Sequence, residues 1–380
     1  MSDLPTFALS ISPAVVAPLL AWYRENRRDL PWRQDPTPYE VWVSEIMLQQ
    51  TRVEAVKPYY HRFLAALPTL QDLAQAPEEV YLKLWEGLGY YSRVRNMHKT
   101  AELVCREHGG AFPADLDALR RLPGVGDYTA GAIASIAFGL PCPAVDGNVL
   151  RVVTRLCAYE ADISLPATKR AITEGLAAVY PSGADAGDFT QSLIELGATV
   201  CVPNGEANCG ACPLRDVCAA RAQGRVDDLP VRSPKAKRKI EPRTVLLLRD
   251  AGSGRPEELR YALRKRPDKG LLAGLWEFPN LPGHLSPEEA LDYARGLGLE
   301  PLRIRPLPAA KHIFTHIEWH MTAYELFLAA PVPDLPDLDF VTVAALRAGR
   351  TLPSAFAAYK KYVVSEGAAE DAEDASGGTF

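Results

Sequence analysis

Residues 122–135 read LPGVGDYTAGAIAS, and this stretch decides the fold of the first half of the chain. It lies between two helical patterns, and at its start Gly124 and Gly126 flank Val125. Such a turn exposes backbone N–H groups, and the next helix presents its positive N-terminal end, so the segment could bind a DNA phosphate without reading base sequence. A plain helix C-cap and turn would explain the same letters. The all-helical surroundings and a downstream cysteine cluster favour a helix–hairpin–helix.

Almost all of the first 220 residues have helical patterns. Ser12 and Pro13 form the expected start of the first helix, an N-cap residue followed by a proline at the first helical position. Apolar residues then recur at the helical period in 41–51, 56–67, 92–107, 129–139, 148–159, 168–180 and 188–200. Proline and glycine occupy the joints between these segments. We expect a compact all-α domain over residues 1–222.

A different pattern begins after a basic, proline-containing linker, which we place at residues 223–242. Strand-like apolar content and alternation mark 243–250, 259–266 and 312–329, whereas 285–298 and 354–364 have helical patterns. These segments predict a smaller α+β domain over residues 243–364. Residues 365–380 are rich in acidic side chains, and we expect them to form a disordered, solvating tail.

The bulk composition is that of a soluble two-domain protein and does not exclude a DNA partner. The chain has 380 residues, 47% hydrophobic and 23% charged, and no apolar run long enough to cross a bilayer. The N-terminus lacks a secretory pattern, so we expect a cytoplasmic protein. Five acidic residues of the tail account for the net charge of −5 and leave 42 acidic residues against 42 basic ones. A local basic stretch at 225–243 can therefore set the field at a DNA-binding face.

Four of the seven cysteines lie close together in a C-x7-C-x2-C-x5-C pattern: Cys201, Cys209, Cys212 and Cys218. Four thiolates this close can surround one metal centre, and the spacing alone leaves zinc and a [4Fe–4S] cluster level. A metal site in a reducing compartment fits this crowding better than a set of disulfides. We expect Cys105, Cys142 and Cys157 to be buried thiols.

Five segments, in order, resemble one protein family. LPGVGDYTAGAIAS, AVDGNVLRV (144–152) and the four cysteines are similar to the helix–hairpin–helix DNA glycosylases with an iron–sulfur cluster. VSEIMLQQTRV (43–53) and GLGYYSRVRN (87–96) resemble specifically the MutY-type adenine DNA glycosylases. The resemblance is dense over residues 13–220 and thinner beyond. It implies a [4Fe–4S] cluster, although the first cysteine gap has seven residues where the family usually has six; a turn at Asn204 and Gly205 would absorb the extra residue.

Excision of adenine needs a proton for the leaving base and negative charge beside the sugar cation, which is the two-carboxylate chemistry of glycoside hydrolysis. Glu45 lies in an apolar helical segment, where desolvation would raise its pKa, and Asp146 lies in a loop just before a helix. Taken singly, Glu45 could be a surface glutamate and Asp146 an N-cap. The resemblance implies that Glu45 is the general acid and that Asp146 stabilises the cation or attacks the sugar.

Tyr128 separates two kinds of glycosylase. Relatives that also nick the DNA backbone carry a lysine at this position, because a Schiff base needs an amine. The tyrosine therefore favours base excision without efficient strand cleavage. By resemblance, Tyr128 and Asn148 support the catalytic carboxylates through hydrogen bonds, although both could be ordinary helix-start residues.

The resemblance also assigns residues to the DNA and to the adenine. Gln50 and Tyr90 match residues that enter the base stack and fill space, as base flipping requires, although an aromatic residue after a glycine turn is often part of a core. Gln49 and Gln50 are otherwise hard to explain in an apolar helix. Arg33 and Gln191 match positions that line the adenine pocket, and both could instead face solvent.

In the second domain, GLLAGLWEFPN (270–280) resembles the opening of a Nudix-type fold. The helical segment after it pairs only Glu288 and Glu289 and lacks the R-E-x-x-E-E pattern of a metal-dependent pyrophosphate hydrolase. We therefore expect recognition rather than hydrolysis. Phe314, Thr315 and His316 match the short loop with which family members sense 8-oxoguanine, with threonine where serine is frequent; FTH alone would pass as part of a strand.

The resemblance implies a monofunctional adenine DNA glycosylase. It would remove adenine mispaired with 8-oxoguanine or guanine in duplex DNA and leave an abasic site. We expect a cytoplasmic monomer that associates with the nucleoid when bound to DNA and has no membrane partner. One alternative is a bifunctional glycosylase and AP lyase for oxidised pyrimidines, opposed by Tyr128 and the appended domain. Another is a catalytically silent iron–sulfur DNA-binding scaffold, opposed by Glu45 and Asp146.

Overall fold

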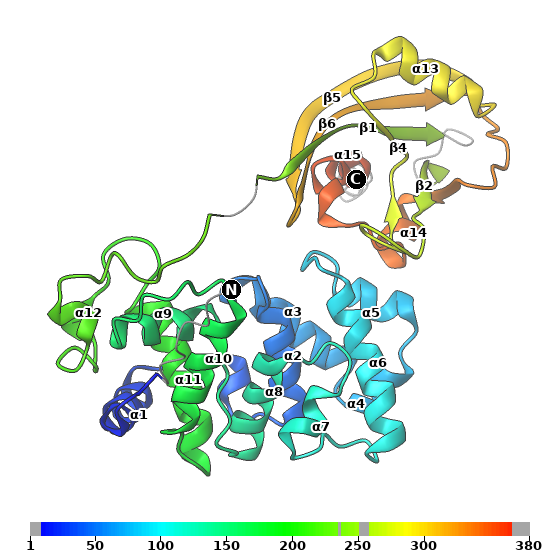
Figure 1. Cartoon of the computed structure of the whole chain (residues 1–380). Coiled ribbons are helices and arrows are strands. Elements are labelled where there is room, and N and C mark those ends of the chain that lie inside the picture. The colour runs from blue at the N-terminus through cyan, green and yellow to red at the C-terminus, as the bar shows by residue number, and fades with distance from the viewer. Residues whose placement is uncertain (1–8, 235–236, 251–257, 367–380) are drawn as a thin grey trace, which may run out of the picture. The chain divides into compact units, whose positions relative to one another are not determined.

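The structure is a computed structural model that describes residues 9–234, 237–250 and 258–366 (Figure 1). The chain divides into two compact units. The helical unit comprises Met1–Ala76 and Ser92–Lys235, and the sheet unit comprises Pro77–Tyr91 and Ala236–Phe380. The sheet unit thus includes a short segment, with α5 (Glu78–Leu84), that lies inside the predicted domain over residues 1–222.

The helical unit is built from short helices joined by tight turns, as predicted. Its α-helices are α1 (Val16–Asn26), α2 (Pro38–Leu48), α3 (Val53–Ala66), α4 (Leu70–Gln75), α6 (Ser92–Glu107), α7 (Leu116–Arg120), α8 (Asp127–Ala132), α9 (Gly147–Leu156), α10 (Pro166–Ala177), α11 (Ala184–Thr199) and α12 (Ala219–Ala222). Shorter 3-10 or π segments are η1 (Pro13–Val15), η2 (Pro31–Arg33), η3 (Ile133–Ala137) and η4 (Cys209–Ala211). Ser12 caps η1, so the predicted start of the first helix is confirmed.

Helix α2 is buried along most of its length. It begins with a capping box, in which Thr37 and Glu40 exchange hydrogen bonds through their side chains and backbone, and Pro38 follows the cap. Residues on all of its faces are buried, including Val43, Glu45 and Met47. Because Glu45 is buried among these residues, its carboxyl group cannot turn to water and must find a partner inside the protein.

The core of the helical unit forms where α1, α9 and α11 meet. Leu19 of α1, Val149 and Val153 of α9, and Phe189 and Leu196 of α11 belong to one buried cluster. The loop with the four cysteines adjoins this core, since Cys201 and Cys212 pack against the cluster and Leu214 belongs to it.

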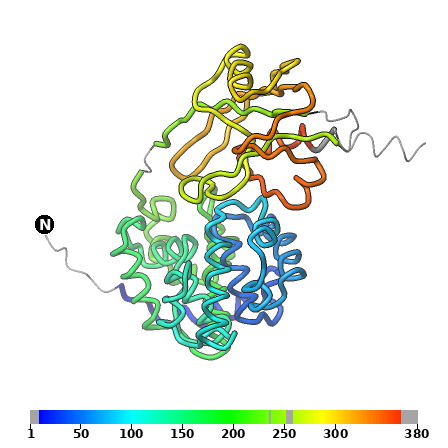
Figure 2. Tube along the Cα trace, turned by 90° about the vertical axis from the view of Figure 1, so that its right-hand side faces the viewer, coloured from blue at the N-terminus to red at the C-terminus, as the bar shows by residue number. Residues whose placement is uncertain are grey.

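The sheet unit contains a mixed sheet with the strand order β3-β2-β1-β6-β5, in which β4 pairs with β1 and β7 with β2. The strands are β1 (Lys239–Asp250), β2 (Arg260–Lys265), β3 (Trp276–Glu277), β4 (Asn280–Pro282), β5 (Pro301–Ile313), β6 (Ile317–Leu328) and β7 (Asp339–Thr342). Strands β1 and β6 are parallel, and the other pairs are antiparallel. Figure 2 shows the long β5 and β6 hairpin (yellow to orange) beside β1 (green).

Helices cover both faces of this sheet (Figure 1). Along β1, Val245 and Leu247 face one core and Leu246 and Leu248 face the other, as the alternation of a strand requires. Helix α13 (Pro287–Gly296) closes the second core, whereas α14 (Val343–Ala348), η6 (Ser354–Phe356) and α15 (Ala357–Glu366) close the first. The predicted fold class, an all-α unit followed by an α+β unit, is confirmed.

The structure refines the prediction at three places in the sheet unit. Strand β1 begins at Lys239, inside the predicted linker, and β5 is a strand that the sequence analysis missed. Residues 314–316 connect β5 to β6, so they do not continue the predicted strand over 312–329. The predicted acidic tail lies outside the described residues from 367 onward. None of the helices described in the structure is long and apolar enough to cross a membrane.

Candidate active site

Glu45 lies on the buried face of α2 beside a neutral hydrogen-bond partner. The residue is only 8% exposed, which excludes the interpretation as a surface glutamate. The hydroxyl of Tyr128, from α8, donates a hydrogen bond to Oε2 of Glu45 at 2.6 Å. The two residues come from segments far apart in the chain, and the contact between α2 and α8 brings them together.

The surroundings of Glu45 favour a protonated carboxyl group near neutral pH. Burial raises the pKa of Glu45 to about 7; the hydrogen bond from Tyr128 opposes this rise, the charge of Asp146 adds to it, and the charge of Arg33 opposes it. A carboxyl group with this pKa can hold and release a proton at the working pH of an enzyme. Burial and the charges of Glu45 and Asp146 raise the pKa of Tyr128, so its phenol stays neutral.

Asp146 is the N-cap of α9, and its carboxylate is held from two sides. The N–H of Val149 donates to Oδ1 at 2.8 Å, and Nδ2 of Asn148 donates to Oδ2 at 2.7 Å. Burial raises the pKa of Asp146, and these hydrogen bonds oppose the rise. The N-cap interpretation is therefore correct, and it does not compete with a chemical role, because the cap fixes a carboxylate whose charge acts on Glu45.

A glycine on α11 allows this end of α9 to come close. A Cβ atom at Gly197 would lie 2.6 Å from the Cβ of Asn148. Real Cβ atoms do not approach so closely, so any larger residue would displace Asn148 and, with it, the hydrogen bond to Asp146.

Arg33 and Gln191 lie together. Nε of Arg33 donates to Oε1 of Gln191 at 3.1 Å, and Nη2 donates to Oε2 of Glu195 at 2.8 Å. The side chain of Arg33 is 8% exposed, so it does not face solvent. Glu195 and its second partner, Arg28, were not predicted, because nothing in their spacing along the chain signals that they meet.

The segment at 122–126 is a hairpin between two helices. Gly124 has a φ of 73°, in the left-handed region, and a Cβ there would lie 2.7 Å from the Cβ of Asn96. Gly126 is the N-cap of α8, and the hydroxyl of Thr100 donates to the carbonyl of Pro123 at 2.7 Å. These contacts fix a turn between α7 and α8, and the helix–hairpin–helix geometry is the one expected from the sequence.

Hydrogen bonds from Arg93 hold the C-terminal end of α2, which is followed by Gln49 and Gln50. Nη1 of Arg93 donates to the carbonyl of Gln49 at 2.8 Å and to that of Ile46 at 2.6 Å, an anchor that the sequence did not reveal. Nε2 of Gln49 lies 3.5 Å from the hydroxyl oxygen of Thr129. Gln50 is exposed and has a φ of 59°, a left-handed conformation that non-glycine residues adopt mainly at turns and functional sites.

Comparison with known proteins now identifies the family. Residues 43–178 match the HhH-GPD superfamily of base excision DNA repair proteins, and residues 248–361 match the NUDIX domain. The chain is 39% identical over 370 residues to the adenine DNA glycosylase of Mus musculus, covering 84% of this chain and 72% of that protein. It is 32% identical over 304 residues to that of Buchnera aphidicola subsp. Baizongia pistaciae, covering 79% and 82%.

The chain belongs to the adenine DNA glycosylase family.

The family resemblance seen in the sequence is thus confirmed. The human adenine DNA glycosylase is 38% identical over 372 residues, which cover 83% of this chain and 67% of that protein. Among solved structures, a thermostable thymine-DNA glycosylase is similar with a TM-score of 0.49 and 27% identity, over 55% of this chain and 96% of that one.

The four cysteines of this family member lie in one loop after α11. Arg155 contacts this loop: its Nη1 donates to Sγ of Cys201 at 3.3 Å, and its carbonyl accepts from Sγ of Cys218 at 3.4 Å. Burial raises the pKa of Cys212 to about 11, and the charges of the other three cysteines add to this rise. Within the described ranges, no group of three or more His, Cys, Asp or Glu side chains is placed to hold a metal ion.

The seven-residue first gap contains a turn. Gly205 has a φ of 78°, and its neighbour Asn204 lies in the same bend, as the sequence analysis expected. Asn208 then caps η4, which carries Cys209. The remaining cysteines, Cys105, Cys142 and Cys157, are only partly buried, so the prediction of buried thiols was wrong.

In the sheet unit, the connection between β5 and β6 carries Phe314, Thr315 and His316. The ring of Phe314 lies edge-on to Trp319, with 5.0 Å between the ring centroids. Nε of Arg238 donates to the carbonyl of Phe314 at 3.1 Å. Tyr90, with a φ of 48°, has its hydroxyl 3.2 Å from that of Thr315, so the sheet unit brings two predicted recognition residues together. Tyr90 is 45% exposed, which argues against a core role.

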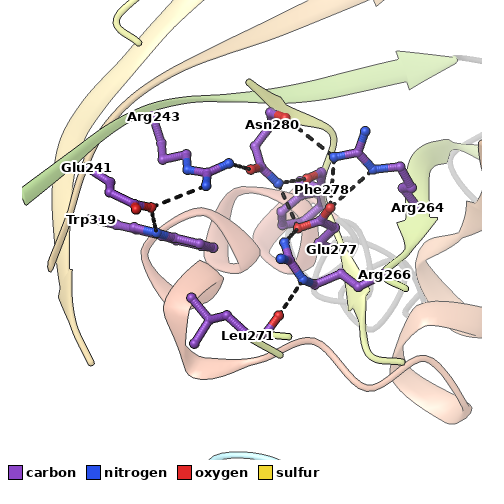
Figure 3. A network of polar contacts seen from close by, with 9 residues as sticks. All are labelled: Glu241, Arg243, Arg264, Arg266, Leu271, Glu277, Phe278, Asn280 and Trp319. Atoms are coloured by element: carbon purple, nitrogen blue, oxygen red, sulfur yellow. Dashed lines mark hydrogen bonds and ion pairs between the residues drawn. The ribbon is translucent and has the colours of Figure 1, made fainter. Parts of the chain in front are cut away.

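The Nudix-like motif of this unit is used for ion pairs inside the protein (Figure 3). Glu277, which is buried, accepts hydrogen bonds from Arg264 at 2.8 Å, from Arg266 at 2.5 Å and from Asn280 at 2.8 Å. Glu289, one of the two glutamates of α13, forms a capping box with Ser286. Both carboxylates therefore have structural partners within the sheet unit.

Proposed function

We propose that this chain removes adenine mispaired with 8-oxoguanine or guanine in duplex DNA by hydrolysing the N-glycosidic bond and leaves an abasic site. The observation that carries the proposal is the buried Glu45 with its neutral partner Tyr128, beside the capped carboxylate of Asp146. This pair of carboxyl groups, one protonated and one charged, is what acid-assisted loss of a base requires. That the excised base is adenine is inferred from the relatives, which are adenine DNA glycosylases.

The proton for the leaving base comes from Glu45. Because Tyr128 donates to Oε2, a protonated Glu45 carries its proton on the other oxygen, Oε1, from which we infer that it passes to the adenine. Transfer of this proton makes the base a better leaving group as the bond to the sugar breaks. The negative charge of Asp146, held by Val149 and Asn148, then stabilises the sugar cation until water attacks it.

Tyr128 makes this chemistry monofunctional. A Schiff base with the opened sugar requires a primary amine, and a phenol cannot form one. Tyr128 instead positions Glu45 through its hydrogen bond, as Asn148 positions Asp146.

The DNA is held by backbone groups and inspected by side chains. The turn at Gly124–Gly126 offers N–H groups to a phosphate, and Gln50 and Tyr90 enter the base stack and fill space around the lesion. Arg33 and Gln191 line the adenine pocket. In the sheet unit, the loop at Phe314, Thr315 and His316 reads the opposite base, and the contact between the hydroxyl groups of Tyr90 and Thr315 supports a recognition role for this loop.

We propose a [4Fe–4S] cluster on the four cysteines. The donor set fits in its chemistry, since one loop supplies four free cysteines and Arg155 donates a hydrogen bond to Cys201 that would stabilise a thiolate. A bound cluster would link the thiolates and stiffen the loop, which carries the exposed Arg215 and is followed by Arg221. Metal analysis of the purified, brown protein tests this proposal; zinc in place of iron would contradict it and leave the glycosylase intact.

We expect the protein to act as a monomer on DNA in the cytoplasm and on the nucleoid. Size-exclusion chromatography with light scattering, with and without duplex DNA, tests the monomeric state.

The decisive experiment is single-turnover release of adenine from an 8-oxoguanine:adenine duplex, compared with a guanine:adenine duplex. We expect release from both, and its loss in Glu45→Gln. If wild type and variant are equally inactive, the enzyme proposal fails and the scaffold alternative stands. Borohydride treatment tests the lyase alternative, because an efficient covalent adduct would contradict a monofunctional enzyme.

A further inference from the structure

Glu195 is a fully buried carboxylate on α11 whose two oxygens bind two arginines. Oε1 accepts the N–H and the Nε of Arg28 at 3.1 and 2.7 Å. Oε2 accepts Nη2 of Arg28 at 2.9 Å and Nη2 of Arg33 at 2.8 Å. Burial raises the pKa of Glu195, but the hydrogen bonds from Arg28 and Arg33 outweigh this and lower the pKa to about 2, so the group is a charged carboxylate.

Arg33 connects this carboxylate to Gln191. Since a guanidinium has only donors, the atom of Gln191 that Arg33 contacts must be the carbonyl oxygen, and the amide NH2 group remains to donate elsewhere. A donor suits adenine, whose ring nitrogens accept hydrogen bonds. Nη1 of Arg33 also donates to the carbonyl of Arg28 at 3.1 Å, so the guanidinium is fixed by three different residues.

The charge of Arg33 also reaches the catalytic acid. The groups that act on Glu45 are Tyr128 from α8, Asp146 at the start of α9 and Arg33 from η2. Arg33 favours the ionised form of Glu45, whereas Asp146 favours the protonated form. The positive charge that Glu45 experiences therefore depends on how well Glu195 balances Arg33.

We propose that Glu195 is a positioning residue for adenine excision: it holds Arg33, through Arg33 it orients the donor group of Gln191, and it balances the positive charge near Glu45. This inference rests on the proposed function. Glu195 does not touch the reacting atoms. Its effect on the reaction passes through Arg33.

Three variants test this role. Glu195→Gln keeps the shape and removes the negative charge, and Arg28→Gln removes a positive charge from the other side of Glu195. Asp188→Asn is the matched control: Asp188 also lies on α11 and binds an arginine, Arg24, at 2.9 Å. Adenine release from the 8-oxoguanine:adenine duplex is measured in single turnover from about pH 5 to about pH 9 for each protein, with circular dichroism to confirm folding.

The two charge changes should move the alkaline limb of the rate profile in opposite directions. Without the negative charge of Glu195, Glu45 loses its proton more readily, so the alkaline limb moves to lower pH by about half a pH unit to one pH unit. Without the positive charge of Arg28, the alkaline limb moves to higher pH by a similar or smaller amount. Asp188→Asn leaves the limb in place. If Glu195→Gln does not fold, the upward shift in Arg28→Gln still decides.

Two other outcomes have different meanings. If both variants reduce the rate by the same factor at every pH, Glu195 is only structural and the inference is overturned. If the wild type itself releases no adenine, the proposed function fails, whatever the variants do.

Discussion

Helices α2 and α11 each bury one glutamate, and the pKa values of the two carboxyl groups are shifted in opposite directions. Glu45 on α2 has a pKa near 7, whereas Glu195 on α11 has a pKa near 2. Both are removed from water, so burial does not explain the difference. Glu45 receives a hydrogen bond from the neutral hydroxyl of Tyr128, whereas Glu195 receives several from two guanidinium groups. A buried carboxyl group thus keeps a raised pKa when no cationic group donates a hydrogen bond to it.

The same fold thus uses one residue type for two purposes. On α11 the ionised carboxylate fixes Arg28 and Arg33, and this fixes the surroundings of Gln191. On α2 the carboxyl group of Glu45 has a raised pKa and can therefore hold or release a proton near neutral pH. Substitution of either glutamate, or of its hydrogen-bond partner, tests this difference.

The largest effect is expected for Glu45→Gln. The amide keeps the size of the side chain but has no acidic proton, so single-turnover adenine release should fall by about 10²- to 10⁴-fold. Thermal unfolding should change little, because an amide can still accept the hydrogen bond from Tyr128. A variant with more than a tenth of the wild-type rate at pH ~7 would show that Glu45 is not the acid.

The acid dependence of stability should separate the two glutamates next. The pKa of Glu195 is lowered on folding, so its contribution is present above its unfolded value and is lost as the pH falls toward about 2. After allowance for solvent screening, we expect wild type to lose about 2 kcal/mol through this group. Urea unfolding at pH ~7 and pH ~3 measures it.

In Glu195→Gln this pH-dependent part is missing. The variant should be less stable than wild type at neutral pH, because two arginines lose their counter-charge, and the gap should close on acidification. A gap of constant size would contradict the assignment of a charged Glu195.

A smaller effect is expected for Tyr128→Phe. Loss of the hydrogen bond leaves the carboxyl group of Glu45 less well oriented, so the rate below the alkaline limb should fall about tenfold. That bond also opposes the rise in the pKa of Glu45, so the limb should move to higher pH. The pH profile of adenine release checks both. An unchanged profile would mean that Tyr128 does not act on Glu45.

The smallest effect is expected from a substitution at the N-terminal cap of α2, away from Glu45. Thr37→Ala removes the side chain that caps the helix, which should cost about 1 kcal/mol of unfolding free energy. The adenine-release rate of the folded protein should stay within about twofold, because Thr37 is at the opposite end of α2 from the glutamines. Paired melts and single-turnover rates test this; a large loss of rate with no loss of stability would contradict it.

The sequence predicted the elements whose patterns are strong. The helical period found the long helices of the helical unit, and the letters LPGVG located the hairpin. Strand β5 was missed because Pro301, Pro306 and Pro308 make its sequence atypical of a strand; these residues are tolerated because β5 pairs with β6 alone. Strand β1 begins earlier than predicted because β6 pairs with it from Lys239 onward.

The site was predicted in part for a similar reason. Motifs pointed to Glu45, Tyr128 and Asp146, which lie in distinctive segments. Glu195 lies outside these segments, and Arg93 lies in one of them (87–96) but was given no role from the sequence. Each acts through partners far away in the chain: Arg33 and Glu195 are 162 positions apart, and Arg93 holds the end of α2 from 44 to 47 positions away. Only the packed fold shows that they meet.

By itself, the sequence determined which chemical groups are available. It supplied two carboxylates in family-like segments, a tyrosine where a lyase needs a lysine, and four thiols in one loop. The tertiary structure decided the state in which each group is held. A pKa depends on desolvation and on charges within a few ångströms, and these arise where segments such as α2 and α8 pack together. Glu45 and Glu195 are the same residue type, but packing gives Glu45 a raised pKa and makes Glu195 a charged partner of two arginines.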